Sequence, residues 1–538
     1  MLRLTEIKLP LDHSAEAIAD AVKAKLGIQP KTIHIFRRAT DARRRSAIHL
    51  IYTLDVETAD EAALLARFAS DPHVAPTPDM SYHHVTRAPA GAARPVVIGA
   101  GPCGLFAALT LAQMGFRPII IERGRVVRER TKDTFALWRK SLLTPESNVQ
   151  FGEGGAGTFS DGKLWSGIRD PAHLGRRVLE EFVRAGAPEE ILVSSKPHIG
   201  TFRLVTVVES LRATIEALGG EYRFGTRVTD LVIGRTPTGA RRIEALELNT
   251  GETLQARQVI LAPGHSARDL FATLVARGVH VDPKPFSVGV RIEHPQSVID
   301  RARFGGFAGH PMLGAADYKL VHHGANGRST YSFCMCPGGT VVAATSEPGR
   351  VVTNGMSQYS RAERNANAGI VVGITPADFP AADANDPLAG IAFQRRLESA
   401  AYIAGGATYA APAQRVGDFL AGRASTALGE VIPSYKPGVR PTDLAECLPD
   451  YVLAAIREAL PVFARKIPGF DMPDAVLTGV ETRTSSPLRI TRGEDFQSLN
   501  TEGLYPAGEG AGYAGGILSA AIDGTRVAEA VARKSLLF

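Results

Sequence analysis

The chain has 538 residues, too many for one ordinary hydrophobic core, so two or three domains are expected. Its hydrophobic content of 44%, its charged content of 22% and its mild net charge of +6 are those of a globular protein that suits anionic ligands without requiring nucleic acid. Four cysteines exclude a disulfide framework, and the chain lacks both a signal-peptide core and an apolar run near the roughly 18 residues of a membrane span, so we expect a cytoplasmic protein without a membrane partner.

The first 88 residues predict a small α+β domain ahead of the rest of the chain. Runs of β-type residues indicate strands, and an apolar face at helical spacing indicates a helix after Ser14, which can cap it. The expected order is strand, helix, strand, strand, helix, at residues 2–11, 14–25, 32–36, 47–56 and 60–68. Residues 71–93 are rich in Pro, Ala and Gly, which is typical of a linker.

A basic run, RRATDARRR, extends from Arg37 to Arg45. Five arginines and one acid in nine residues can contact the phosphates of a nucleic acid. The alternative is a solvated hairpin without a ligand, and we favour that interpretation. Nucleic acid is therefore not the expected partner, but this run is where it would bind.

The stretch RPVVIGAGPCGLFAALTLAQMGFRPIIIERG, residues 94–124, predicts strand, glycine turn, helix and strand. Gly99 allows the tight turn, Gly101 lets a pyrophosphate approach the backbone, and Gly104 lets the helix pack close to the strand. The helix N-terminus offers N–H groups and a partial positive charge to a phosphate. Glu122 ends the second strand, where its carboxylate can accept hydrogen bonds from a ribose 2′-OH. These features predict a dinucleotide site, for either FAD or NAD.

A second glycine-rich stretch, NVQFGEGGAGTFSDGK, occupies residues 148–163. Its glycine density is too high for a helix or a central strand, so we expect a loop. The ordered mix of Gly155, Gly157, Ser160 and Lys163 favours contact with a ligand over a plain connector.

The next segment predicts a β-meander of the kind commonly inserted in FAD-binding folds, spread over residues 222–251. An apolar strand at residues 258–261 then leads into a turn that contains Gly264 and His265. This order closes the FAD fold in flavoproteins of the two-dinucleotide type, where the turn approaches the cofactor. His265 is either a ligand contact or a packed loop residue, and the sequence leaves both open.

The composition changes near Lys284, where an inserted domain is expected to begin. Its predicted strands and helices lie at residues 286–293, 340–345, 391–402 and 444–463.

Two cysteines, Cys334 and Cys336, lie in a strand-like context that predicts both side chains on one face. They can be free thiols that are buried or line a cavity, a redox pair, or metal ligands. A C-x-C sequence lacks the helix-start geometry that lowers a thiol pKa, and Cys447 stands too isolated to complete a zinc site. We favour free thiols and predict no metal site.

The C-terminal sequence GEGAGYAGGI begins at Gly508 and ends at Ile517. In FAD enzymes similar to glutathione reductase, a late Gly-Asp/Glu pair binds the ribitol or pyrophosphate side of the cofactor. The following helix N-terminus faces the flavin, where its dipole stabilises the anionic reduced ring. Glu509 suits the first role, and Gly515 and Gly516 suit the second. FAD is therefore predicted. No second dinucleotide fingerprint is present, so either NAD(P)H binds only transiently as the electron donor, or the donor is not a nicotinamide.

Several motifs together resemble one family, the bacterial FAD-dependent dehydrogenases, within the glutathione-reductase-like superfamily of FAD- and NAD(P)-dependent oxidoreductases. The matching stretches are NVQFGEGGAGTFSDGKL, APGHSARD, KPFSVGVRIEHPQ, YSFCMCPGG, VVTNGMS, ETRTSSPLRI and PAGEGAGYAGGI. The resemblance implies FAD binding, an oxidoreductase and a family-specific C-terminal domain, without a known substrate.

The fold class expected is α/β: a Rossmann-like FAD-binding fold with an inserted α+β domain and a small N-terminal α+β domain. The predicted domains are the N-terminal domain, the first part of the FAD domain, the inserted substrate domain and the last part of the FAD domain, at residues 1–88, 89–285, 286–480 and 481–538. The residues predicted to bind FAD are Gly99, Gly101, Pro102, Cys103, Gly104, Glu122, Arg123, Gly155, Gly157, Ser160, Gly264, Gly508, Glu509, Gly515, Gly516 and Ile517.

The function predicted is hydride transfer between bound FAD and an unidentified organic substrate, in a cavity between the FAD domain and the inserted domain. A flavoenzyme needs an acid or base beside the substrate, and the candidates are Lys163, His265, Glu481, Arg483, Cys334 and Cys336. Arg483 or Arg489 can hold a substrate carboxylate, and the alternative is a structural ion pair with Glu481. The alternatives are a flavin-dependent RNA-modifying enzyme and a non-enzymatic flavin redox sensor or electron-transfer partner.

Overall fold

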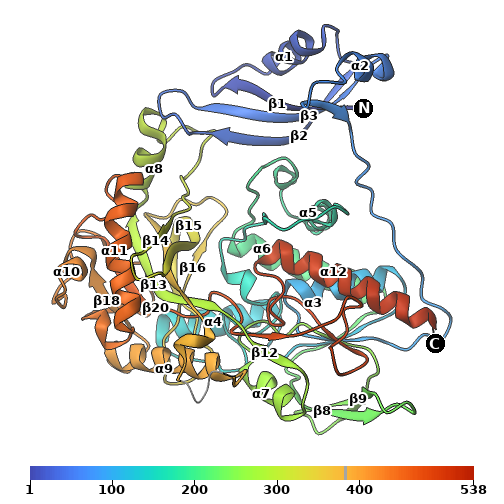
Figure 1. Cartoon of the computed structure of the whole chain (residues 1–538), viewed down its shortest axis with the longest axis vertical. Coiled ribbons are helices and arrows are strands. Elements are labelled where there is room, and N and C mark those ends of the chain that lie inside the picture. The colour runs from blue at the N-terminus through green and yellow to red at the C-terminus, as the bar shows by residue number, and fades with distance from the viewer. Residues whose placement is uncertain (381–384, 538) are drawn as a thin grey trace.

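The computed structural model describes residues 1–380 and 385–537 (Figure 1). Its dinucleotide motif lies in a parallel sheet of strand order β22-β11-β5-β6-β7. Apart from the edge strand β7, these strands are short, apolar and buried, as expected of strands covered on both faces. Their bounds are β5 (Val96–Ile98), β6 (Ile119–Ile121), β7 (Glu221–Arg223), β11 (Val259–Leu261) and β22 (Leu504–Pro506).

Successive residues of this sheet face opposite layers, because strand side chains alternate. Val97, Ile120 and Ile260 pack into a core of helices, whereas Val96 and Ile98 pack into a core with the β-meander. The helical layer contains α3 (Pro102–Gln113), α5 (Leu174–Arg184), α6 (Thr201–Ala217) and α12 (Ile517–Lys534). The other layer contains β8 (Val228–Arg235), β9 (Arg241–Leu248), β10 (Thr253–Gln255) and α7 (Arg268–Ala276). This arrangement confirms the Rossmann-like FAD-binding fold.

Helices α3 and α12 lie side by side although one follows the first strand of the motif and the other ends the chain (Figure 1). A Cβ atom on Gly524 of α12 would overlap the carbonyl oxygen of Cys103 in α3. Glycine at this position therefore allows the close approach of the two helices. The contact brings the N-termini of both helices to the same side of the sheet.

A second, mostly antiparallel sheet forms most of the inserted segment, in the order β14-β15-β17-β13-β20-β18-β19, with β16 paired to β15. Helices α8, α9 and α11 pack against it (Figure 1). Its strands are β13 (Phe286–Pro295), β14 (Val321–His323), β15 (Ser329–Ala343), β16 (Thr353–Ser357), β17 (Asn365–Ile374), β18 (Ala411–Arg415), β19 (Val439–Pro441) and β20 (Val476–Glu481). The helices are α8 (Gln296–Phe304), α9 (Ala389–Ala404), α10 (Val416–Leu420) and α11 (Asp450–Lys466).

The chain passes between the two sheets twice, at a short antiparallel pair of strands. Strand β12 (Val281–Pro283) leads out of the FAD-binding part and pairs with β21 (Leu488–Ile490), which leads back. Strand β20 continues to Glu481, one residue past the limit predicted at residue 480. The domain limits stay a prediction, and residues 381–384 of the predicted inserted domain lie outside the described residues.

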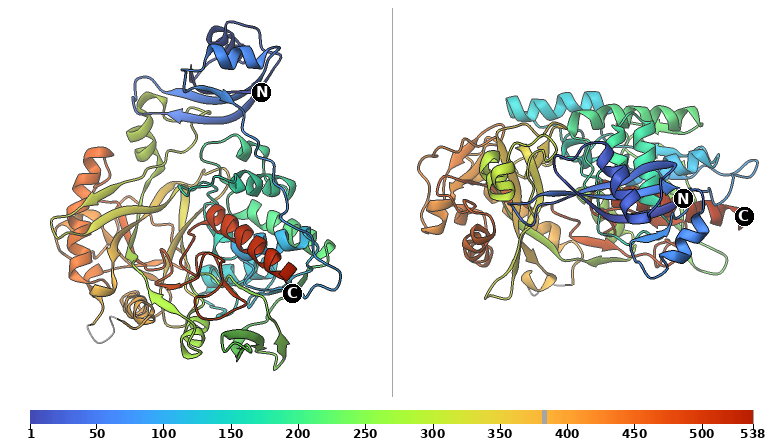
Figure 2. Two further views of the ribbon diagram at one scale, coloured as in Figure 1. Left: turned by 45° about the vertical axis from the view of Figure 1, so that its right-hand side comes forward. Right: turned by 90° about the horizontal axis from the view of Figure 1, so that it is seen from above.

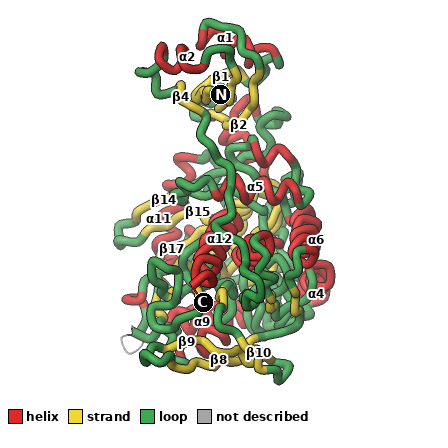
Figure 3. The backbone as a smooth tube through the Cα atoms, turned by 90° about the vertical axis from the view of Figure 1, so that its right-hand side faces the viewer, coloured by secondary structure: helices red, strands yellow, loops and turns green. Residues whose placement is uncertain are grey.

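The N-terminal unit lies at one end of the molecule and is joined to the rest by an extended chain (Figures 2 and 3). Its sheet has the order β2-β3-β1-β4 and carries two helices. Its elements are β1 (Leu2–Pro10), α1 (Glu16–Leu26), β2 (Thr32–Asp41), β3 (His49–Glu57), α2 (Glu61–Arg67) and β4 (Val74–Pro76). Arg38 in β2 exchanges backbone hydrogen bonds with Val193 and Ser195, which anchors this unit to the FAD-binding part.

Several elements differ from the prediction. Strand β2 runs to Asp41, so it includes the first part of the basic run that was predicted to lie between strands. Strand β4 lies inside the predicted linker, because its pairing with β1 and not its composition makes it a strand. Helix α4 (Val127–Lys140) begins earlier than the expected start near residue 133, in a charged segment without a side-chain cap. Strand β15 includes both cysteines of the C-x-C sequence instead of starting after them. In the described residues, no helix is long and apolar enough to cross a membrane.

Candidate functional site

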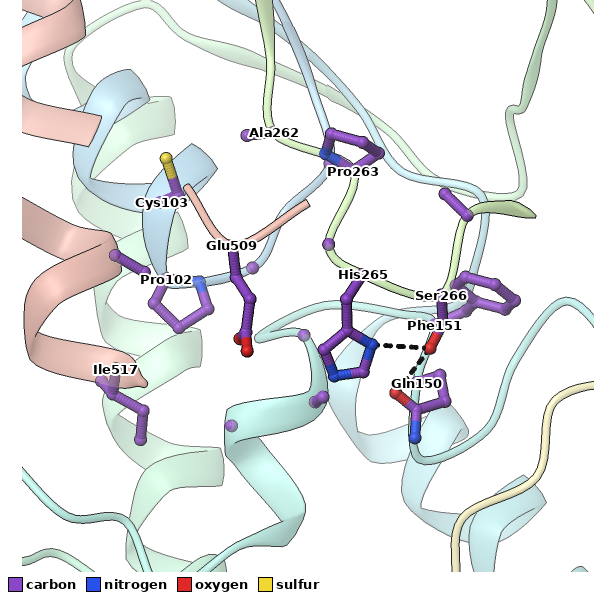
Figure 4. Close-up of a pocket in the computed structure, with 18 of the residues that line it drawn as sticks. Pro102, Cys103, Gln150, Phe151, Ala262, Pro263, His265, Ser266, Glu509 and Ile517 are labelled. Carbon is purple, nitrogen blue, oxygen red and sulfur yellow. Dashed lines mark hydrogen bonds between the residues drawn. The ribbon is translucent and has the colours of Figure 1, made fainter. Parts of the chain in front are cut away.

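A cavity of about 440 Å³ opens where the carboxyl ends of β5, β6, β11 and β22 meet the N-termini of α3 and α12. Parallel sheets of this type bind ligands at this edge. The predicted FAD-binding residues that line the cavity are Gly99, Gly101, Pro102, Cys103, Glu122, Arg123, Gly155, Gly157, Ser160, Gly264, Glu509, Gly515, Gly516 and Ile517. Figure 4 shows Pro102 and Ile517 on one side of the cavity and His265 on the other.

The glycines of the opening motif have two roles: some line the cavity, and others allow close packing of the backbone behind it. A Cβ atom on Gly101 would lie 3.6 Å from the Cα atom of Gly155, an ordinary contact, so the space in front of Gly101 is open. A Cβ atom on Gly104 would overlap the carbonyl oxygen of Gly99. Gly104 and Gly508 do not line the cavity; a Cβ atom on Gly508 would lie 2.8 Å from that of Cys103. These two residues support the wall from behind.

The N-termini of α3 and α12 both meet the cavity at uncapped glycines, Gly101 and Gly516. Neither glycine can supply a capping side chain, so the first N–H groups of each helix lack a cap at the cavity. At the start of α12, the Glu509 carboxylate accepts a hydrogen bond from the backbone N–H of Gly516. Each helix also has its positive dipole end there. The cavity is therefore prepared for two separate anionic groups of one ligand.

The carboxylate of Glu122 holds the glycine loops together. It accepts hydrogen bonds from the backbone N–H groups of Ala100, Gly124 and Gly152 at 2.9, 2.8 and 3.0 Å. Sequence reasoning predicted a ribose contact for Glu122 and did not foresee these three bonds. The ribose contact stays a prediction, because Glu122 also lines the cavity.

Arg123 lines the same part of the cavity and is fixed by three neighbours. Its guanidinium pairs with Glu146 and Asp269, each at 2.8 Å, and lies 4.0 Å above the centre of the Phe151 ring. This side chain is therefore a rigid part of the wall.

Glu509 projects into the middle of the cavity (Figure 4). Burial raises the pKa of its carboxyl to about 7, although the nearby charge of Lys284 acts in the opposite direction. Behind it, Asp523 accepts a hydrogen bond from the backbone N–H of Gly508 at 2.7 Å and pairs with Arg492 at 2.6 Å. The backbone that carries Glu509 is thus fixed, while its carboxyl group lines the cavity.

His265 lies at the cavity wall within a polar chain of contacts (Figure 4). Its Nδ1 is 2.9 Å from the Ser266 hydroxyl, which donates to Gln150 Oε1 at 3.0 Å and accepts from Arg483 at 3.1 Å. Burial and the charges of Arg483 and Arg268 lower the pKa of His265 to about 3. The imidazole is therefore neutral at physiological pH, and it is both packed and exposed to the cavity.

The structure corrects the predicted partner of Arg483. Its guanidinium pairs with Glu398 at 3.2 Å, whereas Glu481 pairs with Arg291. Glu398 also pairs with Arg268 at 2.7 Å and is fully buried. Burial by itself would raise the pKa of Glu398, but the charges of the two arginines hold it well below its usual range. Arg483 is therefore held by a buried ion cluster at the edge of the cavity.

Lys163 lies in another part of the wall, close to strand β15. Its ammonium donates to the carbonyl oxygen of Met335 and lies 3.7 Å from Asp161, which also pairs with Arg361. Trp165 lines the same cavity and is 41% exposed, so this part borders the solvent. Lys163 is thus a charged side chain beside the cavity's opening.

Glu481 and Cys334 complete this part of the cavity wall. The buried Arg291 donates to Glu481 at 2.9 Å, to Asn367 at 2.7 Å and to the carbonyl oxygen of Cys334 at 3.0 Å. Cys336 is fully buried and does not line the cavity, so the two predicted cysteines differ in exposure. Among the residues that the structure describes, no group of three or more His, Cys, Asp and Glu is arranged to hold a metal ion.

Sequence reasoning missed Arg291, Arg268 and Glu398, which position the residues at the wall. A usable signal existed for Arg291, because a charge inside the otherwise apolar strand FSVGVRIE requires a buried partner. Arg268 and Glu398 carry no such signal, since both fall in helices where an exposed charge is ordinary. The structure describes the whole basic run from Arg37 to Arg45, and none of its arginines lines the cavity.

Comparison with known families finds three matches along the chain. Residues 93–284 match the family described as "Pyridine nucleotide-disulphide oxidoreductase", and residues 285–484 match "FAD-dependent protein, C-terminal domain-like". Residues 1–57 match a domain of unknown function.

An uncharacterized protein of Clostridium beijerinckii is 44% identical over 544 residues, covering 99% of both chains. Among solved structures, L-proline dehydrogenase from P. horikoshii is 14% identical with a TM-score of 0.34, covering 83% of this chain and 93% of that one. Glycine oxidase from Geobacillus kaustophilus is 13% identical with a TM-score of 0.34, covering 81% and 94%. On its family matches and its full-length relative, the chain belongs to a family of FAD-dependent oxidoreductases with a characteristic C-terminal domain.

Proposed function

We propose that the protein transfers hydride between its FAD and a small organic substrate that binds beside Lys163, Cys334 and Glu481. One observation carries this proposal: a single cavity extends from the glycine motif of the parallel sheet to side chains of strands β15 and β20 in the second sheet. A cofactor held only for its own stability would not need charged side chains from another domain beside it.

The residues of the cavity fit FAD. The open space in front of Gly101, at the positive end of α3, suits the pyrophosphate, and Glu122 suits the adenosine ribose. Glu509 suits the ribitol hydroxyls, and the N-terminus of α12 suits the flavin edge that becomes negative on reduction. When bound, FAD supplies two-electron hydride chemistry.

The chain's own residues would orient the substrate and control its protonation. Lys163 offers a cation, and burial raises the pKa of Glu481, although Arg291 opposes this effect. Glu481 can therefore hold a proton beside the substrate more readily than an exposed carboxyl can. Neutral His265 and the rigid Arg483 cluster exclude water from the interior side of the cavity.

The electron donor is tested by anaerobic stopped-flow of the purified yellow protein with NADH, with NADPH and with reduced ferredoxin. We expect rapid bleaching of the flavin by a nicotinamide, followed by repeated turnover with a small organic acceptor. Reduction without turnover with any acceptor would favour the non-enzymatic flavin redox sensor. Colourless protein that takes up no FAD on reconstitution would contradict the proposal altogether.

A further inference from the structure

Strand β15 is irregular where it carries the two cysteines. Its pairing with β17 shifts register between Phe333 and Cys336, and Cys334 has a φ of +41°, in the left-handed region that non-glycine residues rarely adopt. Irregularities of this kind re-aim a side chain and persist only where the surroundings hold them. Here the result is that Cys334 lines the cavity while Cys336 is 0% exposed.

Two cations, the buried Arg291 and the partly exposed Lys163, hold this irregular backbone in place. Arg291 donates to the carbonyl oxygen of Cys334 from both terminal nitrogens, at 3.0 and 3.2 Å. Lys163 donates to the carbonyl oxygen of the next residue, Met335. The Cys336 thiol lies 3.3 Å from the Cys334 carbonyl oxygen and donates to it. Such an arrangement is unnecessary for two cysteines that serve only as small packed residues.

The surrounding groups shift the pKa values of the two thiols in opposite directions. A hydrogen bond from Cys336 and the charges of Lys163 and Arg291 lower the pKa of Cys334 to about 5, although burial and Asp161 oppose them. The hydrogen bond to Cys334 and burial raise the pKa of Cys336 well above its usual value. At neutral pH the pair therefore consists of a thiolate at the cavity and a protonated thiol behind it.

We propose that Cys334 and Cys336 form a redox-active dithiol at the flavin cavity, with Cys334 as the attacking thiolate, Cys336 as the resolving thiol, and a small-molecule disulfide as the substrate. The inference rests on the proposed function, because it places the pair beside FAD, and it replaces our preference for inert free thiols. It also names a substrate class for the cavity.

The reaction balances without a further reagent. The Cys334 thiolate attacks one sulfur of the substrate disulfide, forms a mixed disulfide and releases the first thiolate. Cys336 gives its proton to that thiolate and attacks the Cys334 sulfur, which releases the second thiolate and leaves a Cys334–Cys336 disulfide. Two electrons and one proton from reduced FAD then restore the Cys334 thiolate and the Cys336 thiol. The net result is one substrate disulfide converted to one thiol and one thiolate, with FAD oxidised.

Electron counting tests the proposal on the air-oxidised holoenzyme. Anaerobic titration with dithionite should consume four electrons per FAD in the wild type, two for the flavin and two for the disulfide. Cys334→Ser and Cys336→Ser should each consume two, with FAD content unchanged. Cys447→Ser, which alters a buried thiol away from the cavity, should still consume four. A wild type that consumes two electrons with full FAD content overturns the proposal.

A second readout does not require FAD, so it separates failure of this proposal from failure of the proposed function. Diamide treatment of the reduced protein should remove two hydrogen masses from the peptide that contains both cysteines, in holoprotein or apoprotein. With oxidised glutathione as the probe, glutathionylated Cys334 should accumulate in the reduced Cys336→Ser variant, whereas the reduced wild type should form the Cys334–Cys336 disulfide instead. Unchanged peptide mass after diamide overturns the dithiol, whatever the flavin content.

Discussion

At the scale of single residues, the three glycines of the opening motif have different physical tasks. Gly101 has an extended backbone and open space before its Cα atom, whereas Gly104 is enclosed by the backbone of Gly99. A change to alanine at Gly101 should therefore impair cofactor binding and leave folding intact. The same change at Gly104 should impair folding.

We expect Gly101→Ala to fold normally but to lose most of its FAD, because the new methyl group fills the space for the pyrophosphate. Gly104→Ala should lose stability by about 1–3 kcal/mol or more, because its methyl group overlaps backbone that cannot move away. Flavin absorbance per protein and urea unfolding of the apoproteins measure the two effects. Equal FAD content in Gly101→Ala and the wild type would contradict the assignment of the space in front of Gly101 to the pyrophosphate.

Glu509 makes the apoprotein's stability depend on pH. Its folded pKa, about 7, lies above the unfolded value, so folding binds a proton and the stabilising contribution is full below about pH 4. This contribution is lost as the pH rises through 7. Glu509→Gln removes the dependence, so the variant should be more stable than wild-type apoprotein at pH 8, by about 3 kcal/mol. The difference should shrink toward pH 4. Urea unfolding at both pH values measures it, and parallel pH profiles would refute the prediction.

At the scale of elements, the contact between α3 and α12 sets the width of the cavity. Alanine normally stabilises a helix by about 0.5–1 kcal/mol relative to glycine. At Gly524, however, the added methyl group would overlap the Cys103 carbonyl oxygen and push the helices apart. The packing cost should outweigh the gain in helix propensity.

Gly524→Ala should therefore destabilise the protein, by about 1–3 kcal/mol, and weaken FAD retention. Gly167→Ala is a matched control, because a Cβ atom there meets nothing within 4 Å. Thermal unfolding and FAD content measured on both variants distinguish the packing effect from a general effect of alanine. Stabilisation by Gly524→Ala would show that α12 can shift without cost.

The elements that could be predicted from the sequence are those defined by local signals. The strand–turn–helix–strand order predicted for residues 94–124 is found in the structure, with α3 at Pro102–Gln113, because glycine spacing and apolar runs are local signals. Strand β4 and the full length of β15 were missed, because hydrogen bonds to partner strands define them. The irregular backbone at Cys334 was also not predictable, since Arg291 and Lys163 hold it from distant segments.

At the scale of the whole molecule, a buried ion cluster joins the two parts of the chain. Glu398 in α9 binds both Arg268, at the start of α7, and Arg483, which follows β20. The cluster therefore connects the layer that contains α7, on one face of the parallel sheet, to the inserted segment. It lies at the cavity wall.

Replacing Glu398 by glutamine should leave the buried Arg483 without its paired carboxylate and Arg268 with only Glu347, and cost about 3–5 kcal/mol of unfolding free energy. Glu347→Gln is the comparison: Glu347 pairs with Arg268, Arg350 and Arg395 but is 22% exposed, so its loss should cost less than the loss of the fully buried Glu398. The lowered pKa of Glu398 means that its contribution is present at neutral pH and is lost as the pH falls far below 4. Equal urea midpoints for the two variants would contradict this role.

The sequence by itself determined the cofactor-binding fold and predicted the glycine loops that line the cavity, because a dinucleotide motif is a local pattern of glycines, strand and helix. It also placed His265, Glu481 and Arg483 near the site. Only the tertiary structure decided which of them pair, that Cys334 faces the cavity while Cys336 is buried, and that Glu398 holds Arg483. Such facts depend on contacts between segments far apart in the chain, and burial sets both the charge state and the partner of each group.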